Sequence, residues 1–358
     1  MGLENKVIKN ISFKNDNTGV KLEENFLSIE EVNNVLTDNM GKVGREWFKF
    51  QTIWAYNAYN RFKDMDKYLI LVYLIQKTFK HYSDTFIIIS EETFYSREEF
   101  EIEKLNLIEI SEDLQIPKET IRRKINELNM KDIIARQGKK VTIKLEGFAI
   151  QRPKTSITML SRFLSVITEF LSKDPNFLSE SINKENIEDF IRGNYTLIWR
   201  YFFRLQIPTL IKWRKFYGDL ESWLIAGTII VNQTEKLKDK FQGKRPVILD
   251  GKNLTNDEKF SEWMKFVVAN NEEVVGVNAS SIAEITGIPR ATVIRKLKYL
   301  KKRKLVVKDK NKLYVMGKQK TELAGLLKIY KDVQFNIYKF ATTFFEIYKN
   351  KGDIPKAK

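Results

Sequence analysis

The chain has 358 residues and a formal net charge of +16, and it contains no cysteine. The missing cysteines exclude disulfides and thiolate zinc sites, and nothing points to an oxidising compartment. The N-terminus lacks a signal-peptide core, and the longest apolar runs, Tyr68–Ile75 and Trp223–Val231, are too short to cross a bilayer. We therefore expect a cytoplasmic protein without membrane contact, long enough for two domains plus connecting helices.

The N-terminal segment, residues 1–44, is expected to be a polar arm followed by a short helix. Residues 1–27 are rich in Asn, Lys and Glu and show little periodicity. Ser28 and Glu31 then form a capping box, the usual opening of a helix. The first predicted domain, residues 45–150, starts directly after this segment.

The first domain begins with an aromatic helical stretch that contains Trp47. The apolar spacing predicts a long helix over residues 66–80, then a short strand at 86–89 and a further helix over 96–108. Aromatic residues at helical spacing favour core packing over stacking on single-stranded bases, although both uses remain open at this point.

Residues 151–194 form the predicted linker region, which opens at the break around Pro153. An apolar seam with alternating spacings of three and four residues follows, typical of a packing helix. Its residues are Ile157, Leu160, Leu164, Ile167 and Leu171. A second aromatic stretch over 187–217 leads into the second predicted domain, residues 195–316, whose polar insertion at 240–259 has no assigned role.

The second domain ends in the most informative stretch of the sequence. Ser280 and Ser281 are expected to cap a short helix, which Gly287 ends through a left-handed conformation. Pro289 then opens a second helix, along which Val293, Leu297 and Leu300 form one apolar stripe. Two β-prone runs, 305–308 and 312–315, follow around turn-forming residues. This order predicts a helix-turn-helix followed by a basic hairpin.

The C-terminal segment, residues 317–358, continues as a helix with a long apolar seam. The seam consists of Leu323, Leu326, Tyr330, Val333, Ile337, Phe340, Phe344 and Ile347. Two interpretations are open: packing within the chain against the linker helix, or a homodimer formed through residues 323–347.

The helix-turn-helix stretch occurs twice. Residues 110–143 align without a gap on 282–315, at an offset of 172, and nine of these 34 positions are identical where chance gives about two. The identical pairs are Ile110/Ile282, Glu112/Glu284, Ile116/Ile288, Pro117/Pro289, Thr120/Thr292, Arg123/Arg295, Lys124/Lys296, Leu128/Leu300 and Lys140/Lys312. Upstream, residues 64–70 resemble 219–225 at an offset of 155. Gln115 stands in place of Gly287, so the first copy fits the turn pattern less well.

The positive charge is concentrated in the two copies. Residues 118–144 hold nine Lys and Arg against three acids, and residues 290–312 hold eleven against one. These excesses of +6 and +10 together equal the net charge of the whole chain, +16. Such a local excess is typical of a surface that binds a polyanion.

The two stretches resemble the winged-helix DNA-binding module of transcription regulators of the IclR, MarR and cyclic-AMP-receptor types. The resemblance covers about 40 residues of the 358 and identifies a module, not an individual protein. It implies a mostly α-helical fold with small β-wings, in which two tandem winged-helix domains are joined and followed by long helices. The implied partner is double-stranded DNA, read by the second helix of each module.

The candidate DNA-binding residues follow from the polar face of each second helix and from each wing. In the first copy they are Lys118, Thr120, Arg122, Arg123 and Asn126 on the helix, with Lys139 and Lys140 on the wing. In the second copy they are Arg290, Thr292, Ile294, Arg295 and Lys298 on the helix, with Lys308, Lys310 and Lys312 on the wing.

The predicted function is a sequence-specific DNA-binding protein, a transcriptional regulator that reads paired half-sites. One alternative is a plasmid or phage replication initiator, because such proteins also resemble tandem winged helices in one chain. Another is a winged-helix scaffold that binds protein. The sequence has no P-loop, dinucleotide fingerprint or paired histidines, so we expect no enzyme, no cofactor and no metal. The single histidine, His81, is interpreted as a surface or helix-end residue.

Overall fold

The computed structural model describes residues 29–85, 87–102, 105–137, 140–145, 154–173, 178, 180–240, 254–269, 275–318 and 320–350. In this part of the chain helices dominate, and the strands form two small antiparallel sheets. The expected fold class is confirmed at this level. The helices are α1 (Ile29–Asp38), α2 (Met40–Phe62), α3 (Met65–Asp84), α4 (Glu91–Tyr95), α5 (Leu107–Leu114), α6 (Lys118–Met130), α8 (Lys154–Leu171), α9 (Lys184–Gly193), α10 (Tyr195–Tyr217), α11 (Leu220–Lys240), α12 (Asn256–Ala269), α13 (Ala279–Thr286), α14 (Arg290–Lys302) and α15 (Lys320–Lys349).

Each half carries a small sheet beside its second short helix. The strands are β1 (Glu99–Ile102), β2 (Ile134–Gln137), β3 (Lys140–Lys144), β4 (Val306–Lys308) and β5 (Tyr314–Met316). The first sheet has the order β1-β3-β2 and the second pairs β4 with β5. An isolated bridge from Val277 to Tyr314 takes the place of a third strand in the second sheet.

The structure repeats its elements at the two offsets seen in the sequence. The pairs α1/α9 and α2/α10 have identical lengths at an offset of 155, and α3 and α11 begin at matching residues. The pairs α5/α13 and α6/α14 have identical lengths at an offset of 172. We call the part from α1 to α8 the first half and the part from α9 to α15 the second half. The repetition therefore extends upstream to α1 and α9, well beyond the stretches whose side chains match.

Backbone conformation repeats as well as helix length. Left-handed residues end α2 at Lys63 and α5 at Gln115, and their counterparts Gly218 and Gly287 also have positive φ angles. Gln115 has φ 54° where Gly287 has φ 69°. The missing glycine thus leaves the turn unchanged, although a residue with a Cβ adopts this conformation at some cost.

Three local expectations were wrong. Residues 87–89 are not in a strand, and the helix expected over 96–108 is interrupted by β1 at 99–102, which pairs with β3. The alternation of exposed and buried side chains along β1 is the strand period that helical scanning missed. Asn278, and not Ser280 or Ser281, caps α13, by accepting a hydrogen bond from the Ser281 N–H over 2.8 Å.

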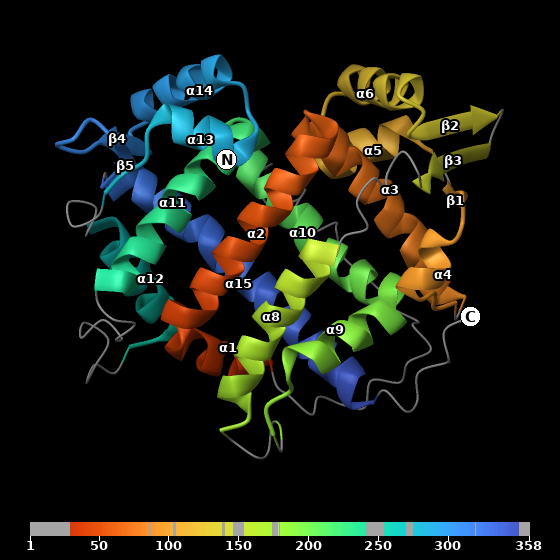
Figure 1. Ribbon diagram of the computed structural model, residues 1–358, viewed down its shortest axis with the longest axis horizontal. Coiled ribbons are helices and arrows are strands. Elements are labelled where there is room, and N and C mark those ends of the chain that lie inside the picture. The colour runs from red at the N-terminus through yellow and green to blue at the C-terminus, as the bar shows by residue number, and fades with distance from the viewer. Residues whose placement is uncertain are drawn as a thin grey trace, which may run out of the picture.

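Long helices of each half pack on long helices of the other half at the centre of the molecule (Figure 1). Helix α2 of the first half packs on α11 of the second, and α10 of the second half packs on α3 of the first. In the same way, α8 of the first half packs on α9 of the second, and α15 of the second half packs on α1 of the first. One hydrophobic core therefore spans both halves, whereas the domain boundaries expected from sequence stay a prediction.

Both apolar seams and both aromatic stretches lie inside this core. The seam residues of α8 are fully buried, and those of α15 from Leu326 to Ile347 are at most 7% exposed. Trp54, Trp199 and Phe202 contact one another where α2 and α10 meet, so core packing is confirmed for the aromatic stretches. The seam of α15 contacts α1 and α10 of the same chain, and a homodimer through 323–347 stays a prediction.

Candidate nucleic-acid interface

The second module, defined as α13, α14, β4 and β5, is built around a tight turn. Gly287 ends α13 by donating its N–H to the Ala283 carbonyl over 2.9 Å. Thr286 reinforces the turn, because its hydroxyl accepts the Ile288 N–H over 3.2 Å and donates to the Ile282 carbonyl over 2.6 Å. Pro289 occupies the N-cap position, and α14 starts at Arg290.

The first module, defined as α5, α6, β2 and β3, has the same geometry with other hydrogen bonds. Ser111 donates its hydroxyl to the Ile116 carbonyl over 2.7 Å, and the Ile116 N–H returns a bond to the Ser111 carbonyl over 3.2 Å. Pro117 again precedes the second helix. Each second helix buries its apolar stripe in the module, namely Ile121, Ile125 and Leu128 on α6 and Val293, Leu297 and Leu300 on α14.

Helix α14 presents a continuous basic face to solvent. The predicted residues Arg290, Arg295 and Lys298 are exposed, and Thr292 and Ile294 are half-buried beside them. Lys301 and Lys302 at the end of the helix are also exposed, although they were not among the predicted contacts. The helix contains no acidic residue, so none of these charges is neutralised along it.

Helix α6 exposes the corresponding side chains but neutralises part of their charge. Lys118, Arg122, Arg123 and Asn126 are exposed, and Thr120 is half-buried. Arg122 forms an ion pair with Glu119, and Arg123 lies 3.8 Å from the Glu127 carboxylate. The first module therefore offers a weaker field to a polyanion than the second.

One identical lysine in each module is not part of the exposed face. Lys296 lies 2.6 Å from Asp219 at the start of α11 and 3.9 Å from Glu221. Its counterpart Lys124 forms an ion pair with Asp64, the cap of α3 and the counterpart of Asp219. The repeat marked both lysines, but only the structure shows that they attach each second helix to a long core helix.

Burial would raise the pKa of the Asp219 carboxyl, but hydrogen bonds from Lys296 and from the Ser222 N–H outweigh it, so the pKa lies below its ordinary value. Burial raises the pKa of the neighbouring Glu221 carboxyl above its ordinary value. The hydrogen bond from Lys67 to Glu127 lowers the pKa of that carboxyl in the first module. Lys296 of α14 therefore stabilises the charged form of Asp219, and Lys67 of α3 stabilises that of Glu127.

The hairpin of the second module also presents its predicted lysines to solvent. Lys308, Lys310 and Lys312 are exposed, and Asp309 organises the turn by accepting the backbone N–H groups of Asn311 and Leu313. In the first module, Lys139 lies outside the described residues. The backbone of Lys140 belongs to β3, but its side chain also lies outside them.

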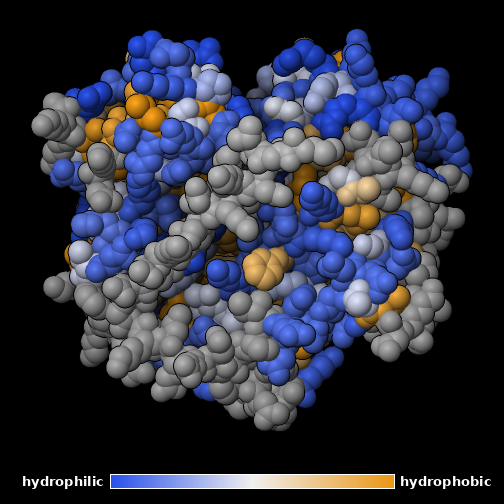
Figure 2. Space-filling model, turned by 180° about the vertical axis from the view of Figure 1, so that it is seen from behind, coloured by the Kyte–Doolittle hydropathy of each residue, from blue (hydrophilic) through white to orange (hydrophobic). Residues whose placement is uncertain are grey.

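Helices α6 and α14 occupy the same edge of the molecule, one on each side of the crossing long helices (Figure 1). Seen from behind, hydrophilic residues cover both raised ends of this edge (Figure 2). The two helices that carry the predicted residues therefore lie on one edge of the molecule, and both expose basic side chains. We call this the α6–α14 edge.

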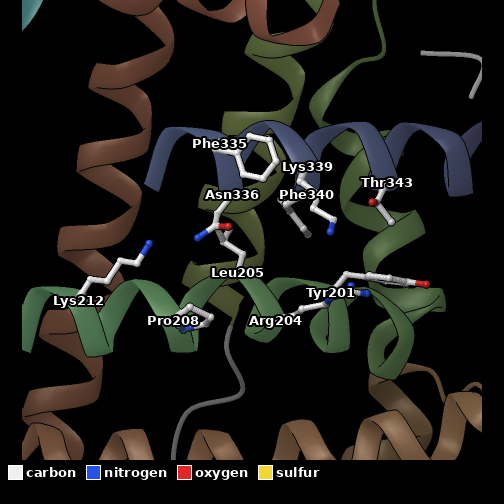
Figure 3. Close-up of a pocket in the computed structure, with 10 residues that line it drawn as sticks. All are labelled: Tyr201, Arg204, Leu205, Pro208, Lys212, Phe335, Asn336, Lys339, Phe340 and Thr343. Carbon is white, nitrogen blue, oxygen red and sulfur yellow. The ribbon is translucent and has the colours of Figure 1, made fainter. Parts of the chain in front are cut away.

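A recess of about 230 Å³ lies between α10 and α15, and Arg204, Asn336 and Lys339 are among the residues that line it (Figure 3). None of the lining residues belongs to α6 or α14. We therefore assign the recess no part in the interface.

Other kinds of site find no support in the described part of the chain. It contains no group of three or more His, Asp or Glu side chains placed to hold a metal ion. None of its helices is long and apolar enough to cross a membrane. His81 is exposed in the last turn of α3, where its carbonyl accepts the Thr85 hydroxyl.

No protein-family model, curated protein or solved structure matches this chain.

Proposed function

We propose that the protein is a sequence-specific double-stranded DNA-binding protein, a transcriptional regulator with two tandem winged-helix modules. One observation carries the proposal: α6 and α14 expose equivalent basic faces on one edge of the molecule. Each is the second helix of a helix-turn-helix followed by a small sheet, which is the order of a DNA-reading winged helix.

The mechanism is occupancy of a duplex lying along the α6–α14 edge. Lysines of the hairpins and of the α14 end contact phosphates and fix position, without reading sequence. Arginines on the exposed faces bind guanine through two hydrogen bonds, and Asn126 pairs in the same way with adenine. Thr120, Thr292 and Ile294 contact thymine methyl groups or nearby phosphates.

A protein-binding scaffold is the competing function from another class. It predicts that the basic faces are covered or paired with acidic residues. Arg295 and Lys298 are instead exposed on a helix without acids, which favours DNA. A replication initiator uses the same surface, and the joining of both modules in one chain suits it equally. Direct repeats of the bound site beside an origin would favour the initiator, and a single site beside a promoter would favour the regulator.

The test is selection from a random duplex pool by the full chain at two salt concentrations, with the bound fraction sequenced. We expect binding that weakens steeply with salt and enriches one motif made of two spaced parts. Salt-sensitive binding without enrichment would make the protein a non-specific DNA binder. Absence of binding at low salt would refute the proposal.

A further inference from the structure

We infer that a single copy of this chain occupies a complete DNA site whose two half-sites are inverted relative to each other. The inference rests on the proposed function and adds the symmetry of the site and the stoichiometry of the complex. It follows from how the two halves are related in space, which the sequence repeat alone leaves open.

The halves are related by a pseudo-twofold axis. A twofold relation makes every contact reciprocal: if a surface of one half touches a second surface of the other, the converse contact also exists. The structure has both members of each pair, α2 on α11 with α10 on α3, and α8 on α9 with α15 on α1. A head-to-tail arrangement of the halves would give one member of each pair without the other.

Gln51 and Gln206 mark where this axis passes. They are counterparts at the offset of 155, and the Gln206 carboxamide donates to the Gln51 carboxamide over 2.9 Å in the core. A residue meets its own counterpart only close to a twofold axis. The Glu221 carboxylate also accepts the Met65 N–H over 3.2 Å, so the starts of α3 and α11, which are counterparts, meet as well.

The axis runs between α6 and α14 towards the edge that carries both (Figure 1). A duplex in contact with both helices therefore lies across the axis. A B-form duplex has its own twofold axes perpendicular to its length, and one of them then coincides with the axis of the protein. This superposition makes the two half-sites inverted repeats, as in a symmetric dimer, but within one chain.

The site is an imperfect palindrome, and its expected form is specific. Arg123 and Arg295 are identical counterparts, so they read the same base, once on each strand, at equal distances from the centre. Asn126 corresponds to Lys298, and Arg122 to Ile294, so the bases these positions contact differ between the half-sites. The acid-free α14 holds the tighter half-site.

The spacing between half-sites is also fixed, because both modules are attached to the same core. Lys124 and Lys296 attach α6 and α14 to long helices of one continuous core. Inserting about five base pairs turns one half-site to the opposite side of the duplex, since the helix repeats every 10–10.5 base pairs. We expect such an insertion to weaken binding at least tenfold.

The experiment applies the duplex selection to the full chain and to Arg123→Ala and Arg295→Ala, with Lys265→Ala on α12 as the control for a lost surface charge. Each arginine variant is expected to lose one base preference, on opposite strands and opposite sides of the centre. Lys265→Ala is expected to select the unchanged motif. A duplex with one half-site reversed is expected to bind at least tenfold more weakly, and native mass spectrometry is expected to show one chain per duplex.

The possible results distinguish an error in the half-site symmetry from an error in the proposed DNA binding. If both arginine preferences fall on the same strand, or if the reversed duplex binds better, the half-sites are direct repeats and the inference is wrong while DNA binding stands. Two chains on one site would overturn the stoichiometry. If the chain binds no duplex at low salt, the proposed function itself fails.

Discussion

The ammonium group of Lys296 lies 2.6 Å from the carboxylate of Asp219, and this ion pair joins α14 to the start of α11. Asp219 also accepts the Ser222 N–H over 2.7 Å, so one carboxylate caps a core helix and holds a lysine of the exposed helix. Asp64 does the same for α3 and Lys124. The orientation of both basic helices is thus set by α11 and α3, the long helices that start at these two carboxylates.

Replacing Lys296 with methionine is expected to destabilise the protein by about 1–3 kcal/mol. This loss lies between the values typical of exposed and of buried ion pairs, because the Lys296 side chain is 10% exposed and that of Asp219 is 41% exposed. Methionine retains the apolar stem, so the loss reports the charge. Denaturant unfolding measures it against Lys298→Met, an exposed change on the same helix expected to cost less than about 0.5 kcal/mol. Equal losses would show that the ion pair does not hold the module.

The same pair makes part of the stability dependent on pH. The pKa of Asp219 is lowered in the folded protein, so its contribution is present above the unfolded value of about 3.9 and is lost as pH falls through the folded value. Burial raises the pKa of Glu221, so as pH falls this carboxylate is protonated, and its attraction to Lys296 is lost, before that of Asp219. The free-energy difference between wild type and Lys296→Met is expected to be constant near neutral pH and to shrink at acidic pH. A pH-independent difference in unfolding titrations would argue against this pair.

Much of the fold was predictable because the sequence repeats. The identities that align residues 110–143 with 282–315 located both helix-turn-helix elements and their buried stripes. Upstream, only a short match starting at Asp64 and Asp219 remained visible. Helices α1 and α9 repeat in length with different side chains, because helical packing tolerates exchange among apolar residues.

The relation between the halves was not predictable. Reciprocal packing of α2 on α11 and α10 on α3 depends on contacts between residues of different halves, far apart in the sequence, and periodicity carries no information about them. The ion pairs of Lys124 and Lys296 could not be predicted for the same reason, since their acidic partners lie at the start of another helix. Exposure of the remaining basic residues could be predicted, because they lie opposite an apolar stripe.

Gln115→Gly is expected to stabilise the protein by about 0.5–1 kcal/mol. The left-handed conformation costs a residue with a Cβ about 1–2 kcal/mol, and part of this is returned by the greater freedom of glycine in the unfolded chain. Gln115 is exposed with φ 54°, so little side-chain contact is lost. Thermal unfolding measures the gain. The matched reverse change, Gly287→Ala, is expected to destabilise, because its Cβ would collide with the Asn60 carboxamide. A loss of stability in Gln115→Gly would show that the side chain is needed.

We expect the contributions of Gln51 and Gln206 to the free energy of unfolding to be coupled, because the two side chains bond to each other at the pseudo-twofold axis. Either single change to leucine leaves the other buried carboxamide without its partner and is expected to cost about 1–3 kcal/mol. The double change is expected to be nearly neutral, since each carboxamide already has one buried polar atom without a hydrogen bond in the described part of the chain. A double-mutant cycle in denaturant measures the coupling, and additive losses would exclude it.

We expect Lys301 and Lys302 to contact phosphates and so position the duplex, without reading its sequence. Both are exposed at the end of the helix, one or more turns beyond Arg295, where a duplex would present phosphates to them. Replacing both with alanine is expected to lower the slope of log affinity against log salt by about 2, because each phosphate contact releases about 0.9 counterion. The weakening should be equal for selected and random duplexes.

Arg295→Ala is expected to behave differently and cost about 1–3 kcal/mol on the selected duplex with little change on random sequence, because a base contact carries sequence preference. Fluorescence anisotropy at several salt concentrations distinguishes the two patterns, with Lys265→Ala as the control for charge alone. If the lysine pair altered the selected motif, or if Arg295→Ala weakened all duplexes equally, the assignment of reading and positioning roles along α14 would have to be exchanged.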